Sequence, residues 1–209
     1  MWESIATVCA AADRKKYRVV LAGAIGLMCS VAVHDVALGA ERYITVYAGK
    51  YTDDKLGEVL TNKPITFEHS YLGVIAFSHT LGETLRAYQW ELETQIGKHG
   101  GAQTHWEFNV APVIRWKRFP WNDFLNTTVA IGDGLSCATE IPPLEQSSST
   151  NEGAARLLNY FLFEMTAAPP GEYRWSIVGR VHHRSGVFGL FNNVHGGSNI
   201  VAIGLKFTY

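Results

Sequence analysis

After residue 40, short segments of alternating apolar and polar residues follow one another along the chain, separated by turn residues. In one of them Tyr88, Trp90 and Leu92 share one face of a strand, whereas Glu91 and Glu93 share the other. A period of two is typical of β-strands, because successive side chains point to opposite faces of a sheet. The pattern therefore predicts an all-β protein.

Eight such segments can be counted, each near or above the ~9–11 residues that a tilted strand needs to cross a bilayer. They cover about residues 42–52, 66–80, 85–97, 104–118, 126–136, 156–167, 173–185 and 198–209. The first, second and sixth alternate less regularly, so their registers stay open. No segment after residue 40 is a run of roughly 18 apolar residues, which argues against a helical span. We therefore predict an eight-stranded antiparallel transmembrane β-barrel of the outer-membrane type.

The placement of aromatic and charged residues favours a barrel in lipid. Large rings lie near the ends of the apolar faces, as an aromatic girdle requires, and the chain ends on Tyr209 with apolar residues at every second position before it. A soluble lipocalin-like barrel, with its apolar face inward, is the alternative. Because eight strands leave no room for an aqueous channel, a porin is excluded and the polar faces should fill the lumen with ion pairs. The charged residues concerned are Glu91, Glu93, Glu107, Arg115 and Lys117.

The first 40 residues read as a cleaved signal peptide, which leaves 41–209 as a single barrel domain. A basic cluster at 14–18 precedes the apolar run 19–33, and small residues up to Ala40 suit signal peptidase. An uncleaved anchor is the alternative, although the run is shorter than the roughly 20 residues of a helical span. In the cleaved chain Cys137 would be the only cysteine, which excludes an intramolecular disulfide.

Composition removes two further classes. Of the 209 residues, 47% are hydrophobic, 12% aromatic and only 18% charged, which excludes a disordered chain. Lys and Arg number 18 against 19 Asp and Glu, so no basic excess points to nucleic acid as a partner.

The candidate chemistry lies at the end of the seventh segment. There His183 and Ser185 continue the apolar, outward parity, whereas Arg180, His182 and Arg184 point into the lumen. An imidazole two residues from a hydroxyl on one strand face can take its proton and make the serine a nucleophile. Polar side chains that face lipid are costly unless they serve a purpose, although a place in the headgroup zone, without catalysis, would also accommodate them.

A metal centre is not predicted. The histidines His182, His183 and His195 lie close together in sequence, but no cysteine or carboxylate completes a recognisable ligand spacing. We therefore expect neither a metal nor another cofactor.

The C-terminal part, with His183-Arg184-Ser185 in the penultimate strand, a Gly/Asn-rich loop and a closing strand, resembles the lipid A 3-O-deacylase (PagL-like) family. The resemblance covers residues 180–209; over 41–179 it rests on strand count and signal alone. It implies an eight-stranded outer-membrane barrel that hydrolyses an ester-linked acyl chain of lipid A without metal. His183 would be the base and Ser185 the nucleophile, and Asn193 would support the oxyanion.

The sequence departs from this family at the acid that orients the histidine. No Asp or Glu follows Glu172, and Gly196-Gly197-Ser198-Asn199 stands where the family has its Glu. Asn199 has the outward parity and could hold His183 by a hydrogen bond. Asp133 also has it, but its strand is not adjacent to the seventh.

Three functions are therefore carried forward: a lipid A ester hydrolase, a non-catalytic structural or interaction barrel, and a soluble periplasmic lipid-binding barrel. The first places the protein in the bacterial outer membrane with lipopolysaccharide as its partner, the second places it in the same membrane, and a homodimer stays open.

Overall fold

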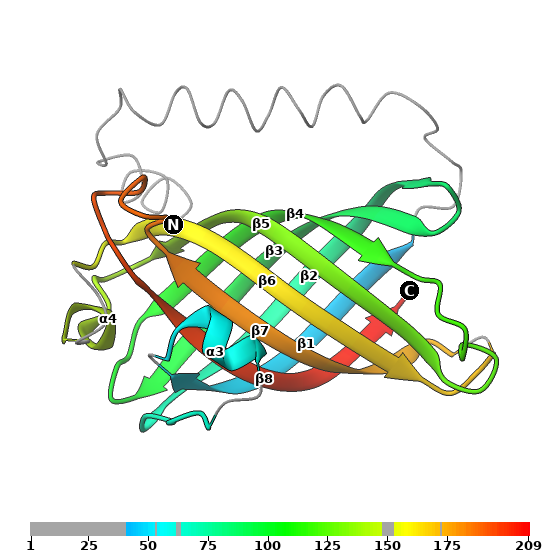
Figure 1. The fold of residues 1–209 in the computed structure, drawn as a ribbon, viewed down its shortest axis with the longest axis horizontal. Coiled ribbons are helices and arrows are strands. Elements are labelled where there is room, and N and C mark those ends of the chain that lie inside the picture. Colours follow the sequence, from blue (N-terminus) through cyan, green and yellow to red (C-terminus); the bar gives the residue numbers. More distant parts are fainter. Residues whose placement is uncertain (1–40, 53, 62–63, 148–152, 172) are drawn as a thin grey trace.

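The computed structural model describes residues 41–209, except 53, 62–63, 148–152 and 172. Eight antiparallel strands form a closed barrel in which each strand pairs with its neighbours in sequence and β8 returns to β1 (Figure 1). The strands are β1 (Arg42–Thr52), β2 (Ser70–Thr84), β3 (Tyr88–Gly101), β4 (Trp106–Trp116), β5 (Asn126–Ala138), β6 (Leu157–Ala168), β7 (Trp175–Ser185) and β8 (Gly197–Thr208). Two short helices, α3 (Leu56–Leu60) and α4 (Pro143–Ser147), lie in connections.

The predicted fold class and the number of strands are confirmed. The strand bounds differ most at the β2–β3 hairpin, where β2 continues to Thr84 and the turn comprises Leu85, Arg86 and Ala87. Leu85 and Arg86 have positive φ, 56° and 52°, as the central residues of a type I′ turn require. This turn usually carries Asn-Gly, and without that signal the sequence placed the turn too early. The predicted signal peptide lies outside the described residues.

Among the described residues, no helix is long and apolar enough to cross a membrane.

The two faces of the barrel wall have opposite polarity. Outward side chains are mostly apolar and exposed; Ile203, for example, is 69% exposed. Inward side chains include buried charges such as Glu91 and Arg180. This is the arrangement predicted for a barrel in lipid, and it does not fit the soluble alternative, which needs an apolar interior.

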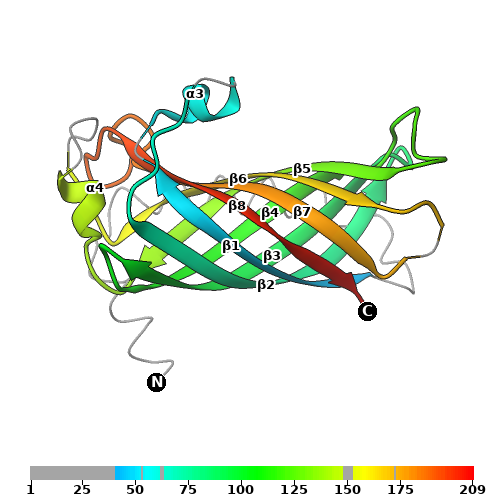
Figure 2. The ribbon, with the colours of Figure 1, turned by 90° about the horizontal axis from the view of Figure 1, so that it is seen from below.

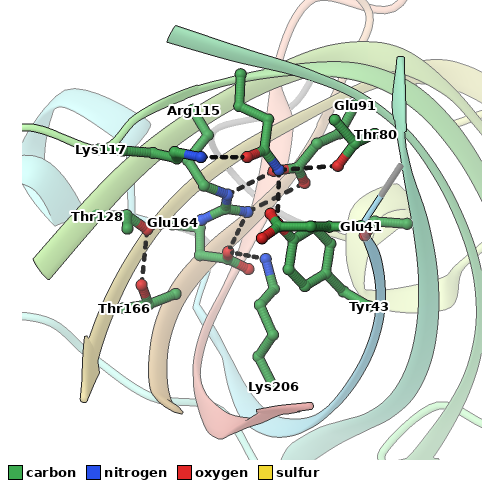
Figure 3. A network of polar contacts seen from close by, with 12 residues as sticks. Glu41, Tyr43, Thr80, Glu91, Arg115, Lys117, Thr128, Glu164, Thr166 and Lys206 are labelled. Atoms are coloured by element: carbon green, nitrogen blue, oxygen red, sulfur yellow. Dashed lines mark hydrogen bonds and ion pairs between the residues drawn. The ribbon is translucent and has the colours of Figure 1, made fainter. Parts of the chain in front are cut away.

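Ion pairs fill the lumen (Figure 3). Arg115 pairs with Glu91 at 2.5 Å and with Glu164 at 2.8 Å, and Lys206 also reaches Glu164 at 2.8 Å. Arg180 pairs with Glu164 and also, at 2.8 Å, with Glu93 on β3, on the opposite side of the barrel. Since each of these charges is buried, loss of one partner would leave another uncompensated. The interpretation of the lumenal charges as packing is thus confirmed for this part of the barrel.

The two ends of the barrel differ. The helices α3 and α4 and the β7–β8 connection 186–196 lie at one end, and the C-terminus lies at the other (Figures 1 and 2). Outer-membrane barrels have longer loops outside and short turns toward the periplasm. We therefore orient the end with α3 and α4 toward the cell exterior.

The cysteine prediction concerns the cleaved chain, whereas the 209-residue chain contains three cysteines. Cys137 is disulfide-bonded in the structure. The other two cysteines of the chain lie outside the described residues. The uncleaved chain therefore differs in this respect from the chain beginning at residue 41, for which no intramolecular disulfide is predicted.

Candidate functional site

The His–Ser pair lies on the outer face of β7, as its parity predicts. His183 and Ser185 are half-buried and point outward, whereas His182 and Arg184 are buried in the lumen. Ser185 is the last residue of β7, so the pair lies at the exterior end of the barrel wall. An outward position at this height faces the outer leaflet of a membrane.

The ring of His183 is held by its neighbour on β8. His183 Nδ1 lies 2.9 Å from Asn199 Oδ1 and 3.1 Å from the carbonyl oxygen of Ser198. A backbone carbonyl only accepts, so Nδ1 carries the hydrogen and donates it. Asn199 Nδ2 donates to the carbonyl oxygen of Asp54 at 2.7 Å, which fixes the amide with its oxygen toward the imidazole. Nε2 of His183 is therefore left as the basic nitrogen.

The space around the pair is shaped by an aromatic ring and a glycine. Phe161, opposite His183 in the β6–β7 register, meets the imidazole edge to face, with centroids 6.4 Å apart. Gly197 is opposite Ser185 in the β7–β8 register. A Cβ at Gly197 would clash with the Arg184 carbonyl oxygen, and it would lie 2.8 Å from His183 Cε1 and 2.9 Å from Ser185 Cβ. Only glycine therefore fits beside the pair at this position.

Within the described residues, no hydrogen bond joins His183 to Ser185. Residues two apart on a strand share a face, and hydrogen bonds between catalytic groups are often long before substrate binds. The structure therefore places the candidate base and nucleophile on the same outward face of β7, without a hydrogen bond between them.

Asn159 extends this polar surface, and sequence reasoning missed it. It is opposite Ser185 in the β6–β7 register and faces outward. Its Nδ2 donates to Asp133 Oδ1 at 2.9 Å and to the carbonyl oxygen of Gly134 at 3.1 Å, so its own oxygen points elsewhere. Asp133 lies two strands from His183. It nevertheless contacts the site, because it accepts a hydrogen bond from Asn159, the residue opposite Ser185. The one feature of the sequence that could have indicated Asn159 is its parity, which places this polar residue on the outward face of β6.

Asn193 lies in the β7–β8 connection, not on a strand. It is exposed and adopts a left-handed backbone with φ 56°, as does Asn192 with φ 52°. Among the described residues, no hydrogen bond links Asn193 to His183 or Ser185. The structure thus groups His183, Ser185 and Asn199, and leaves Asn193 in the loop above them.

Three lumenal side chains could offer ligand atoms to a metal. His99, His105 and Glu107 place such atoms within 4.8 Å of one another. Burial lowers the pKa of His105 to about 3, so its ring is neutral. The rings of His99 and His105 stack at 4.1 Å, and His99 Nε2 already bonds Glu107 at 2.8 Å. The cluster is on the inner side of the wall and does not contribute to the outward site.

No model of a protein family matches the chain, and no curated protein matches it. Solved structures do match. The outer membrane enzyme PagL is 11% identical, with a TM-score of 0.53 over 79% of this chain and 98% of PagL. Neisserial surface protein A is 8% identical, with a TM-score of 0.50 over 84% and 100%. The N-terminal β-barrel domain of OprF from Pseudomonas aeruginosa is 10% identical, with a TM-score of 0.46 over 81% and 97%. At these identities the likeness shows the fold alone, which is that of eight-stranded outer-membrane barrels.

Proposed function

We propose that the protein is an outer-membrane hydrolase that cleaves an ester-linked acyl chain of lipid A by a serine–histidine mechanism. One observation carries the proposal: His183, with its ring oriented through Nδ1, lies beside Ser185 on the outward face at the exterior end of the wall. Lipopolysaccharide would present its esters at this level. The proposal includes export by a signal peptide over residues 1–40.

In the first step Ser185 Oγ attacks the acyl carbonyl carbon while His183 Nε2 takes the hydroxyl proton. The imidazolium is held through Nδ1–H by Asn199 Oδ1 and the Ser198 carbonyl. Collapse of the tetrahedral intermediate breaks the ester bond, and Nε2 returns the proton to the sugar oxygen. Water, activated by the same nitrogen, then releases the fatty acid from Ser185.

In this mechanism Asn199 takes the orienting role that a carboxylate has in the resembling family. The third group of such a triad positions the imidazole and is not itself protonated, so an amide oxygen is sufficient for orientation. Asn193, or backbone amides near Gly196, would bind the oxyanion when the β7–β8 connection meets the substrate. The Asn159 oxygen offers an acceptor beside Ser185 that would help to place the substrate.

The test compares lipid A from outer membranes of cells with and without the protein, by mass spectrometry. Wild type should remove one acyl chain, and Ser185→Ala and His183→Ala should each reduce deacylation by at least ~100-fold. Thr94→Ala, an exposed outward change on β3 at the opposite side of the ring of strands, is the matched control and should be fully active. Unchanged lipid A with correctly inserted wild type would refute the proposal.

A non-catalytic barrel is the second candidate. It is favoured by the amide in place of an orienting carboxylate and by the lack of a hydrogen bond between His183 and Ser185 in the described part of the chain. In that case the same cells would show unaltered lipid A, and loss of the protein would instead change membrane integrity or attachment through the loops.

A further inference from the structure

A groove of about 610 Å³ lies on the outer face over β1 and β2. Ala48 and Gly73, opposite each other in the β1–β2 register, form its floor. A Cβ added at Gly73 would meet no atom within 4 Å. Ile203, opposite Ala48 on β8, bounds one side, and Trp106 on β4 bounds the other. Two small residues between large ones thus create a depression in the wall.

The outward side chains that line the groove are apolar, except for Lys98. The next outward residues of the same strands are half exposed and face the same depression; they are Val46, Ile75, Ile96 and Leu205. The floor residues Ala48 and Gly73 lie on neighbouring strands, and the bounding residues Ile203 and Trp106 are four inter-strand steps apart, about 19 Å around the wall. This width accommodates a hydrocarbon chain, and no polar floor opposes one.

Lys98 lines the groove, and Lys50 lies one outward position beyond its floor on β1, toward the exterior end. Lys98, opposite Gly73 in the β2–β3 register, places its Nζ 5.1 Å from the ring centroid of Trp106. Lys50, two residues beyond Ala48 on β1, places its Nζ 5.6 Å and 6.0 Å from the rings of Phe67 and Tyr71. Stacking on an aromatic face holds each ammonium in place without neutralising it.

These lysines differ from the lumenal ones. Lys206 and Lys117 each pair with a glutamate. No ion pair in the described part of the chain includes Lys50 or Lys98. Two unpaired cations on a lipid-facing wall, above an apolar groove, complement an amphiphile with a negatively charged head.

We propose that this groove binds one acyl chain of a lipid A molecule, with a phosphate of its head group held by Lys98 and Lys50. The choice of lipid A rests on the outer-membrane placement proposed above and on the position of the lysines at the exterior end; it does not require hydrolysis. Around the wall, Lys50 is two strands from β7 and in register with Val181, two residues from His183, which places the two positions about 12 Å apart. A lipid with several chains could therefore occupy the groove and present another chain to Ser185.

The experiment measures lipid retention by native mass spectrometry of the full chain in detergent. The Ser185→Ala background prevents consumption of the ligand if the protein is a hydrolase. The probes are bisphosphorylated lipid A, the same lipid A with its phosphates removed, and phosphatidylglycerol. We expect bisphosphorylated lipid A to be retained at least ~10-fold better than the dephosphorylated form, since charge-assisted bonds to phosphate are strong.

Two variants test the two parts of the site. Lys50→Gln with Lys98→Gln should abolish the preference for phosphate, and Gly73→Leu, which fills the floor, should weaken retention of both forms of lipid A about tenfold. Arg42→Gln removes a cation from the same face of β1 at the other end, and Gly179→Leu adds a side chain at an equally open outward glycine on β7. Both controls should bind as the parent does.

Three results would overturn the assignment: equal retention of phosphorylated and dephosphorylated lipid A, equal retention of phosphatidylglycerol, or full binding by Gly73→Leu. None of them bears on whether Ser185 and His183 hydrolyse an ester, because the lipid A mass test decides that separately.

Discussion

Replacement of Asn199 by alanine tests whether an amide orients the base. In the structure Asn199 is 1% exposed and lies behind the imidazole, so its side chain does not face the space where a substrate would lie. Asn199→Ala removes one of the two acceptors of His183 Nδ1–H and leaves the other, the Ser198 carbonyl at 3.1 Å. We therefore expect the ring to remain bound at Nδ1 but to be less firmly oriented.

The magnitude follows from these two bonds. A hydrogen bond to a charged group contributes about 1.5–3 kcal/mol, and the imidazole is charged in the transition state. Because the Ser198 carbonyl can strengthen when its competitor is lost, about 1–2 kcal/mol should disappear. This corresponds to a loss of about 5–30-fold in kcat/KM, with the fall in kcat and with KM nearly constant.

The assay is a time course of lipid A deacylation by purified protein in micelles, with thermal unfolding of each variant as the control for folding. Asn199→Asp should not exceed wild type by more than about threefold. Its carboxylate would gain a charge-assisted bond to the imidazolium, but it would lose the donor to the Asp54 carbonyl and place an oxygen there instead. A wild-type rate in Asn199→Ala, with Ser185→Ala inactive, would refute the orienting role of Asn199.

Three other expectations concern the wall. Asn159→Leu should lower deacylation about tenfold through KM without lowering the unfolding temperature, because it removes an acceptor beside the serine; unchanged kinetics would contradict a role in substrate placement. Ile203→Arg should reduce barrel stability by roughly 2–4 kcal/mol in lipid if this position is near the bilayer midplane, measured by urea unfolding in vesicles, whereas Thr94→Ala should be neutral. Arg180→Met should destabilise the barrel by about 3–5 kcal/mol in the same assay, because it removes the partner of two buried carboxylates; a neutral result would mean that water compensates them.

Strand parity was the part of the site that sequence could predict. Alternation along β7 placed His183 and Ser185 outward and Arg184 inward, and the same parity on β8 placed Asn199 beside the imidazole. A period of two leaves only two choices for each side chain, so one apolar face fixes the whole strand. The catalytic roles of these residues remain predictions.

The parts that sequence could not predict depend on contacts between distant segments. The carbonyl of Asp54, which locks Asn199, comes from the connection after β1. Asn159 was overlooked because β6 carries apolar residues on both faces: Leu158 and Leu162 are buried in the lumen, so the strand does not alternate clearly. Only the β6–β7 register shows that Asn159 is opposite Ser185.

The two faces of β7 carry polar residues for different reasons. Inside the barrel, His182 bonds Glu107 at 2.7 Å and Arg184 bonds Glu145 at 2.7 Å, so these groups are neutralised within the lumen. Their burial needs no function beyond packing.

On the outer face of β7, the polar residues His183 and Ser185 have no such packing role. His183 and Ser185 stand on a wall whose other outward residues are mostly apolar, and burial of polar groups against lipid costs free energy unless they lie among headgroups or act on a ligand. A headgroup position alone would explain isolated polar residues. The ring of His183 is in addition held by the amide of Asn199, only glycine fits beside the serine, and Asn159 is held by Asp133 on the next strand. These fixed orientations support the proposed hydrolase, because a reacting group must be positioned before the substrate arrives.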